Sequence, residues 1–256
     1  METPLNFNQN NDTNLSIEDA YNLSINNYTH AELSDMLLNG NIKEKQIAAL
    51  KFDKIDNIND AQLLLENLTG CDGKIREAVA YKINLFITQN PDTRRCFAET
   101  SPHIFAKATI DINGNICRLI VDSAAYLKEF EAFSEKYTEQ ILKYTQEALD
   151  ELDKFIFKDK KYIINKQLFK LYWCLDALNH FQDCADYNVL YDILQKCIKQ
   201  QEYTIREKCA QIIASTDIFQ TLREQLINDE NYYVRNVFKS STHLSKYQDD
   251  HPSEIL

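Results

Sequence analysis

Apolar residues recur every three or four positions along most of this chain, and short polar stretches separate the apolar runs. In residues 74–88, for example, Ile75, Val79 and Ile83 fall on one face of a helix. This spacing is typical of α-helices that bury one side. The pattern predicts helices over residues 16–26, 29–38, 42–55, 59–68, 74–88, 91–108, 115–130, 134–157, 163–181, 186–198, 203–215, 217–228 and 232–244.

Turn-forming residues are scarce, since the 256 residues include only 4 glycines and 4 prolines. A β-sandwich or barrel needs turn residues about every 8–12 positions, so it would require many more of them. Helices joined by short polar turns need few. The composition therefore favours an all-α fold without a sheet.

Residues 72–80 combine a tight turn with the start of a buried helix, and similar segments follow at 113–118, 202–207 and 229–235. When the inner helices are aligned with one another, one aligned position, which we call the slot, is occupied by a basic residue in every helix except one, where it is Asn165. Successive slot residues are 29 to 47 positions apart in the sequence. The basic residues in this slot are Lys45, Arg76, Arg118, Arg206 and Arg235. A repeat of this length predicts stacked helical hairpins, because one hairpin cannot bury both of its apolar faces alone.

This repeat resembles the HEAT-repeat family, including its bacterial branch related to phycobilisome-lyase repeats. The inner helix of that family opens with an acid or Asn and a short spacer, followed by Val or Ile, then Arg, and later Ala. The match is closest at Asp72, Ile75, Arg76 and Ala80, and again in residues 229–235.

The resemblance implies a right-handed α-solenoid of about six helical hairpins covering roughly residues 30–245. It also implies that the arginines of the slot are structural. Each would bind a carboxylate or a turn carbonyl in its own or the adjacent unit, such as Asp72 or Asp229.

Three regions follow from the pattern. Residues 1–14 contain five Asn and little to bury, so we expect a disordered leader. Residues 15–245 form the HEAT-like domain, and the weakly apolar segment 15–38 acts as its N-terminal cap. Residues 246–256 are expected to form a flexible tail.

The net charge of −11 argues against nucleic acid as a partner, because phosphate backbones are bound by many cations. No apolar run approaches the roughly 18 residues that a membrane span needs. The N-terminus lacks the basic and apolar regions of a secretory signal. Seven scattered cysteines without a C-x-x-C pair are typical of reduced thiols. We therefore expect a cytoplasmic protein.

Motifs for catalysis are missing from the sequence. It contains no phosphate-binding G-x-x-x-x-G-K, no G-x-S-x-G and no G-x-G-x-x-G, and its five histidines stand apart from one another. We expect no cofactor, no metal site and no catalytic residue.

The preferred hypothesis is a non-catalytic scaffold that binds a protein or peptide on the concave surface of its inner helices. Helical-wheel positions suggest which side chains face that surface. These candidates for partner binding are Glu77, Tyr81, Asn84, Ser123, Lys170 and Gln211.

The alternative is a nucleic-acid-binding protein or a DNA glycosylase with HEAT-like repeats. Lys158, Lys160 and Lys161 belong to the densest basic cluster and could contact phosphates. Trp173 and Asp176 lie one helical turn apart and could hold a base, as an aromatic residue and an Asp do in such glycosylases. The acidic charge and the absence of another Trp weigh against this alternative.

Overall fold

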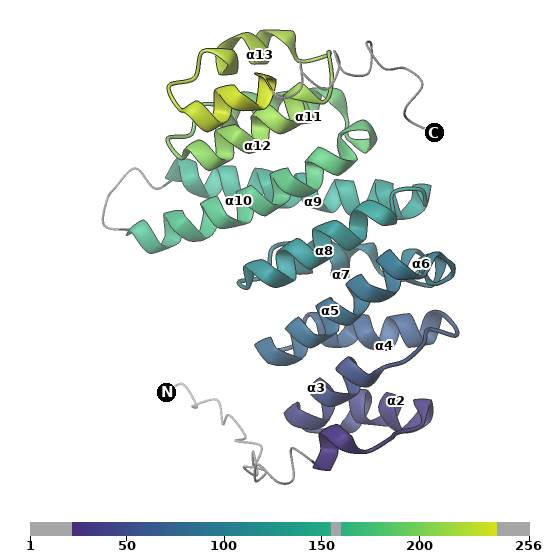
Figure 1. Cartoon of the computed structure of the whole chain (residues 1–256). Helices are drawn as coiled ribbons and strands as arrows, with labels where there is room; N and C mark the ends of the chain where they lie inside the picture. The colour runs from purple at the N-terminus through teal and green to yellow at the C-terminus, as the bar shows by residue number, and fades with distance from the viewer. Residues whose placement is uncertain (1–21, 155–159, 240–256) are drawn as a thin grey trace, which may run out of the picture.

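The structure is a computed structural model that describes residues 22–154 and 160–239, and every regular element in these two ranges is helical. The all-α prediction is therefore confirmed for the described residues (Figure 1). The predicted leader 1–14 and tail 246–256 lie outside them, as do residues 16–21 of the first predicted helix. None of the described helices is both long and apolar enough to cross a membrane.

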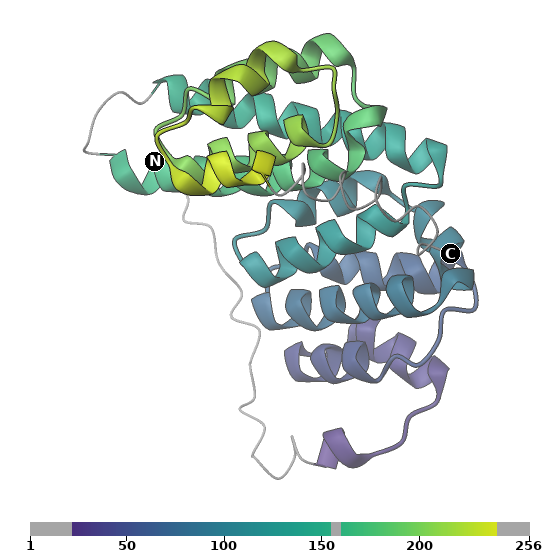
Figure 2. The same ribbon diagram turned by 45° about the horizontal axis from the view of Figure 1, so that its top comes forward.

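The helices form two layers that both follow the order of the chain (Figures 1 and 2). The first layer contains α3 (Ile42–Lys51), α5 (Gly73–Gln89), α8 (Gly114–Tyr126), α10 (Lys161–Phe181), α12 (Tyr203–Ala214) and a final helix at residues 232–239. The second layer contains α2 (His30–Asn39), α4 (Ile58–Leu68), α6 (Pro91–Ala98), α7 (Pro102–Thr109), α9 (Glu131–Lys154), α11 (Tyr187–Cys197) and α13 (Gln220–Ile227). A helical turn at 22–25 and the short 3-10 helix η2 (Gln182–Cys184) complete the set.

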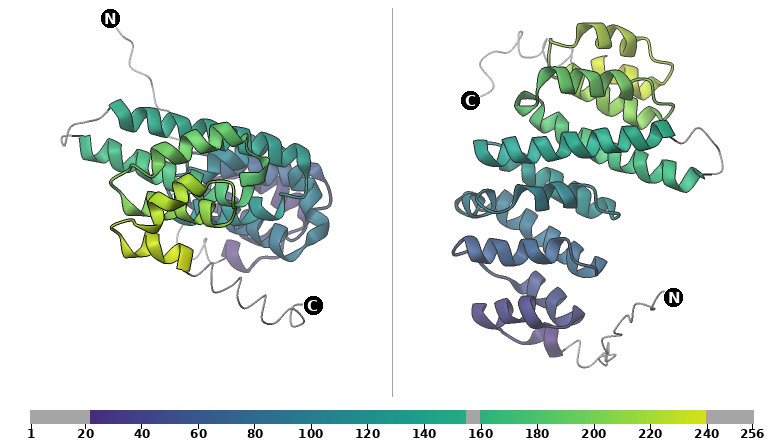
Figure 3. Two further views of the ribbon diagram at one scale, coloured as in Figure 1. Left: turned by 90° about the horizontal axis from the view of Figure 1, so that it is seen from above. Right: turned by 180° about the vertical axis from the view of Figure 1, so that it is seen from behind.

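Each helix of the first layer packs against the next one, from α3 through α5, α8 and α10 to α12. In the second layer α4 contacts α2, α6 and α7, while α9 contacts α7 and α11. The helices α9 and α10 are longer than their neighbours, with 24 and 21 residues, and their joined ends extend past the rest of the molecule (Figure 3). The two layers meet in one continuous apolar core.

Polar N-cap residues allow these helices to begin directly after short turns. Thr29, Asn41 and Asn57 each form a capping box with an acid three residues later, and Asp72 and Asn113 cap the next helices of the first layer. Each cap satisfies backbone N–H groups that have no partner within the helix.

Several predicted helix bounds need correction. The helix expected at 42–55 ends at Lys51, because Phe52 leaves the helix and is fully buried in the core. The segment 91–108 is two helices, since Pro102 starts a new one and proline is favoured at the first helical position. The helix expected at 163–181 begins two residues earlier, at Lys161.

Aromatic rings fill the core between α7, α9 and α10. Phe133 contacts Phe105 and Tyr137 at centroid distances of 5.3 and 5.5 Å, and Tyr137 contacts Phe181 at 5.0 Å. The hydroxyl of Tyr137 pairs with Thr109 at 2.8 Å, so the one polar group of this cluster is satisfied. Burial raises the pKa of Tyr137 well above its usual range.

Arg76 joins one hairpin to the next. Its Nε and Nη2 donate to the two carboxylate oxygens of Asp111 at 2.7 and 3.2 Å. Its Nη1 donates to the carbonyls of Gly70 and Cys71, both at 3.0 Å. Asp111 also accepts a hydrogen bond from the backbone N–H of Asn113 at 2.9 Å. Arg76 thus ties the turn before its own helix to the turn before α8.

Arg206 repeats this arrangement near the other end of the molecule. It donates to Asp229 at 2.7 and 3.0 Å and to the carbonyls of Gln200 and Gln201 at 2.8 and 2.9 Å. Asp229 accepts from the N–H of Asn231 at 2.7 Å. Burial alone would raise the pKa of Asp229, but the hydrogen bonds from Arg206 and Asn231 lower it. We call these two bidentate pairs the arginine clamps.

The clamps correct one of the hydrogen-bond partners predicted for the arginines of the slot. The partner of Arg76 is Asp111 in the next unit, whereas Asp72 caps α5, the helix that carries Arg76. Asp229 does accept from an arginine, Arg206, as expected. Arg235 donates to the carbonyls of Asp229 and Glu230 in the turn before its own helix.

Arg118 does not occupy the slot. Arg76 and Arg206 both stand four residues after their N-caps, and the same position in α8 belongs to Cys117. The thiol of Cys117 donates to the carbonyl of Asp111, six residues earlier, just as Arg76 donates to Gly70. Arg118 is one residue out of register and is therefore exposed.

Lys45 does stand four residues after its N-cap, Asn41. Its ammonium group donates to the side-chain oxygen of Asn67 in α4 at 3.5 Å. A single long bond to a neutral group replaces the bidentate ion pair of the clamps. The contact at this end of the stack is therefore weaker than those made by Arg76 and Arg206.

We predict that Arg76→Ala destabilises the protein, whereas Arg118→Ala does not. Loss of Arg76 leaves Asp111 buried without its cation, which should lower the free energy of unfolding by about 1.5–3 kcal/mol. Arg118 is exposed, so its removal should change stability by less than about 0.5 kcal/mol. Urea unfolding followed by circular dichroism measures both values. Equal losses for the two variants would contradict the assignment of Arg76 and Cys117 to one structural position.

Candidate binding surface

A shallow groove crosses three neighbouring helices of the first layer and has a volume of about 510 Å³. Its lining residues are Gln46 and Leu50 from α3, Lys74, Glu77, Ala78 and Tyr81 from α5, and Asn115, Arg118 and Leu119 from α8. We call this hollow the α5 groove. It combines exposed apolar groups with charges of both signs, since Leu50 and Tyr81 are 47% and 51% exposed.

Two of the predicted binding residues meet in the α5 groove. Glu77 and Tyr81 stand one turn apart on α5, and Glu77 accepts a hydrogen bond from Asn115 of α8 at 3.3 Å. Arg118, which the sequence alignment placed in the structural slot, lines the same groove. Its shift by one residue out of the slot puts a cation beside Glu77 and Tyr81.

Ser123 and Asn84 contact each other instead of facing solvent together. Ser123 is fully buried, donates to the carbonyl of Leu119 at 2.6 Å and accepts from the amide of Asn84 at 3.1 Å. Asn84 also donates to the carbonyl of Leu119 at 3.2 Å. The prediction that Ser123 contacts a partner is wrong, because its hydroxyl stabilises the α5–α8 contact.

Lys170 and Gln211 lie on α10 and α12, away from the α5 groove. The ammonium of Lys170 pairs with Glu147 at 3.0 Å and stands 4.8 Å from the ring centre of Tyr144. Lys170 is thus held against α9. Gln211 is half-buried on α12 and does not line the α5 groove.

The pair proposed for base binding, Trp173 and Asp176, is occupied by protein contacts. Asp176 forms an ion pair with Lys208 of α12, whose ammonium lies 4.9 Å from the ring centre of Tyr172. Trp173 packs edge-on against Phe169 with 6.2 Å between ring centres. Asp176 thus joins α10 to α12, whereas Trp173 packs on a residue of its own helix. Base binding by this pair stays a prediction.

The lysine cluster of the alternative hypothesis is only partly described. Lys158 lies outside the described residues. Lys160 immediately precedes α10, and Lys161 is the first residue of that helix and is exposed. The role of these lysines in nucleic-acid binding stays a prediction.

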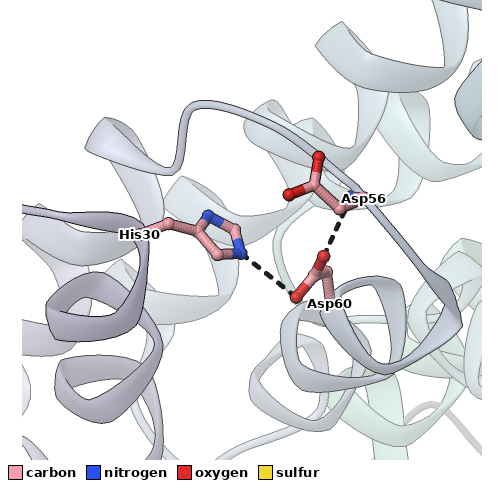
Figure 4. Close-up of side chains that lie close together, drawn as sticks. All are labelled: His30, Asp56 and Asp60. Atoms are coloured by element: carbon pink, nitrogen blue, oxygen red, sulfur yellow. Dashed lines mark hydrogen bonds and ion pairs between the residues drawn. The ribbon is translucent and has the colours of Figure 1, made fainter.

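A separate cluster of titratable groups lies where α2 meets the connection between α3 and α4 (Figure 4). The two ring nitrogens of His30 lie 3.3 Å from a carboxylate oxygen of Asp53 and 3.2 Å from one of Asp60. The other oxygen of Asp60 accepts from the backbone N–H groups of Asp56 and Asn57 at 2.9 and 3.3 Å. No sequence motif signalled this cluster, because its members come from three separate segments.

Among the described residues, His30, Asp56 and Asp60 are the set that could hold a metal ion, since their donor atoms lie within 4.8 Å of one another. Each donor already has a protein partner, however. Asp56 pairs with Lys54, and Asp60 bonds to His30 and to backbone N–H groups. The cluster is therefore explained by hydrogen bonds and ion pairs that join α2 to α4.

Four of the seven cysteines lie in the buried core. All seven are unpaired, and Cys117, Cys174, Cys197 and Cys209 are buried. Burial raises the pKa of Cys117 and Cys174 to about 12. Since the thiolate is the nucleophile, these groups are inert near neutral pH.

We predict that His30 stabilises the fold at low pH and loses this effect as the pH rises. Burial lowers the pKa of His30, but the hydrogen bonds to Asp60 and Asp53 together raise it by more than burial lowers it. The pKa of His30 therefore lies above the ordinary value of 6.5. Its stabilising contribution is fully present below about pH 6.5 and disappears as the pH rises through the folded-state value.

Thermal melts of the wild type and His30→Gln between pH 5.5 and 8.5 test this prediction. The difference in melting temperature between the two proteins should be largest at the acidic end and should shrink steadily towards pH 8.5. A difference that is constant, or that grows with pH, would show that protonated His30 does not join α2 to α4.

Comparison with protein-family models and with curated proteins finds no match for this chain. The likeness to HEAT repeats therefore stays a prediction from the repeated segments of the sequence.

Proposed function

We propose that this chain is a non-catalytic scaffold with HEAT-like repeats, and that it binds a segment of a protein partner in the α5 groove. The groove is the observation that carries the proposal, since it presents Tyr81 and Leu50 between charges from Lys74, Glu77 and Arg118. Exposed aromatic side chains beside an arginine are typical of the residues that dominate the energy of protein interfaces.

The repeat architecture in this proposal is a right-handed α-solenoid. Two features support it. From α3 to α12, each helix of the first layer contacts the next one, as expected when each hairpin packs mainly against the hairpins before and after it. The clamps of Arg76 and Arg206 also repeat one geometry, a bidentate pair with the aspartate of the next turn and two carbonyls of the preceding turn.

The α5 groove suits an extended or helical protein segment better than a nucleic acid. It has two bases, Lys74 and Arg118, and one acid, Glu77, so it provides little attraction for a phosphate backbone. Its apolar side chains would instead receive aliphatic or aromatic groups. The seven unpaired cysteines suit a reducing compartment, and we include a cytoplasmic location in the proposal.

A selection from a library of random 12-residue peptides tests the proposed function. Peptides enriched on the wild-type protein should bind Tyr81→Ala about tenfold or more weakly, because an aromatic anchor at the centre of an interface carries a large share of the binding energy. Arg118→Ala should weaken binding of the peptides that contain acidic residues.

Tyr126→Ala is the matched control, because Tyr126 is an equally exposed tyrosine of α8 that does not line the groove. It should leave peptide affinity unchanged. Selected peptides that bind all three variants as tightly as the wild type would contradict a binding role for the α5 groove.

A further inference from the structure

A second hollow lies beside the N-terminal half of α10, where this long helix extends past α8 (Figure 1). Its volume is about 470 Å³, within the range of roughly 300–1,000 Å³ that ligand sites occupy. The turn from α4 to α5, the end of α7, the turn from α7 to α8, and residues 166–170 of α10 form its walls. We call it the α10 notch.

The α10 notch is basic, although the protein as a whole carries a net charge of −11. Its lining includes the four bases Arg76, Lys107, Lys166 and Lys170 but only one acid, Asp111. Arg76 and Asp111 neutralise each other in the clamp, and Lys170 pairs with Glu147.

Lys107 and Lys166 supply the positive charge that is left over. Both side chains are exposed, and within the part of the chain that the structure describes neither has an ion-pair partner. Lys107 lies in the last turn of α7 and Lys166 lies on α10, so the two lysines line the notch from different elements. A hollow lined by charges of one sign concentrates the field and attracts ions of the opposite sign.

Apolar groups stand beside these lysines. Ile112, in the turn between α7 and α8, is 82% exposed, and Phe169 of α10 is 38% exposed. Ile110 and Ala108 line the same hollow. A ligand for this site therefore needs negative charge together with an aliphatic or aromatic part.

We propose that the α10 notch binds an acidic peptide segment, with its carboxylates at Lys107 and Lys166 and a neighbouring apolar side chain against Ile112 and Phe169. This inference rests on the proposed scaffold function for the choice of a peptide as the ligand, and it adds a second contact outside the α5 groove. The complementary charges of the notch and the peptide are the argument for this occupant.

A nucleic acid fits the notch less well. Two lysines without ion-pair partners neutralise few phosphates, and affinity for a phosphate backbone grows with the number of phosphates contacted. A short peptide needs only the local charge and the apolar contacts.

The single Trp of the sequence provides the measurement. Trp173 packs on Phe169, which lines the notch, so a ligand that contacts Phe169 changes the surroundings of the indole. The probe is the acetylated and amidated hexapeptide Glu-Asp-Phe-Glu-Asp-Leu, titrated into the full chain at about 0.05 M salt. The matched probe replaces each acid with its amide, giving Gln-Asn-Phe-Gln-Asn-Leu.

We expect a saturable change in Trp173 fluorescence with the acidic hexapeptide and a response at least about tenfold weaker with the amide hexapeptide. The double variant Lys107→Glu, Lys166→Glu should weaken binding of the acidic hexapeptide at least about tenfold. The control Lys196→Glu, Lys199→Glu reverses two exposed lysines at the end of α11 and should leave the affinity within about twofold.

Three results would overturn the proposal: no saturable response to the acidic hexapeptide, equal affinity for both hexapeptides, or equal weakening by the two double variants. Tighter binding of a (dT)₁₂ oligonucleotide or of inorganic phosphate than of the acidic hexapeptide would also overturn it, because the notch would then recognise phosphate. Circular dichroism melts of each variant establish that the fold is retained.

The Tyr81→Ala variant separates this inference from the proposed function. It removes a side chain of the α5 groove and should bind the acidic hexapeptide as the wild type does. If Tyr81→Ala loses its selected peptides while the Lys107 and Lys166 substitutions change nothing, the notch proposal fails and the groove proposal stands. The reverse pattern would leave the notch as the binding site and remove the groove.

Discussion

The arginine clamps fix how successive hairpins are placed at two points of the helical stack. In each clamp, two nitrogens of a buried guanidinium donate to the carboxylate of the next turn. The third nitrogen donates to two backbone carbonyls of the preceding turn. Taking a guanidinium out of water is costly unless its charge and its donors are all paired. The clamp meets that condition only when two successive hairpins lie in one relative position, so it fixes the spacing and the register between them.

The candidate surfaces follow from this register. The Arg76 clamp places the turn before α8 against the turn before α5, which brings Asn115 to Glu77 and Ser123 to Asn84 along the length of the two helices. The α5 groove is the exposed side of that contact. The α10 notch uses the same turn as its floor, because Asp111 and the exposed Ile112 both lie there. One structural ion pair thus positions both candidate surfaces.

The sequence predicted the helices well, because the 3.6-residue pattern and the N-caps are local signals that a single segment carries. It predicted the members of the slot less well. Arg118 was chosen because its side chain is basic, whereas the position is defined by distance from the N-cap and belongs to Cys117. The helical wheel predicts that Ser123 is exposed, but one helical wheel cannot show that Asn84 of another helix covers it. Glu77 and Tyr81 could be predicted to lie on the uncovered strip of α5, because apolar residues that face the core occupy most of the other positions of this helix.

A double-mutant cycle on Arg76 and Asp111 tests most directly whether the clamp joins successive hairpins. Urea unfolding of Arg76→Ala, Asp111→Ala and the double variant gives the coupling free energy of the two side chains. The account predicts a coupling of about 1.5–3 kcal/mol, with the double variant losing much less stability than the sum of the two single variants. A coupling below about 0.5 kcal/mol, the level expected for independent sites, would contradict it.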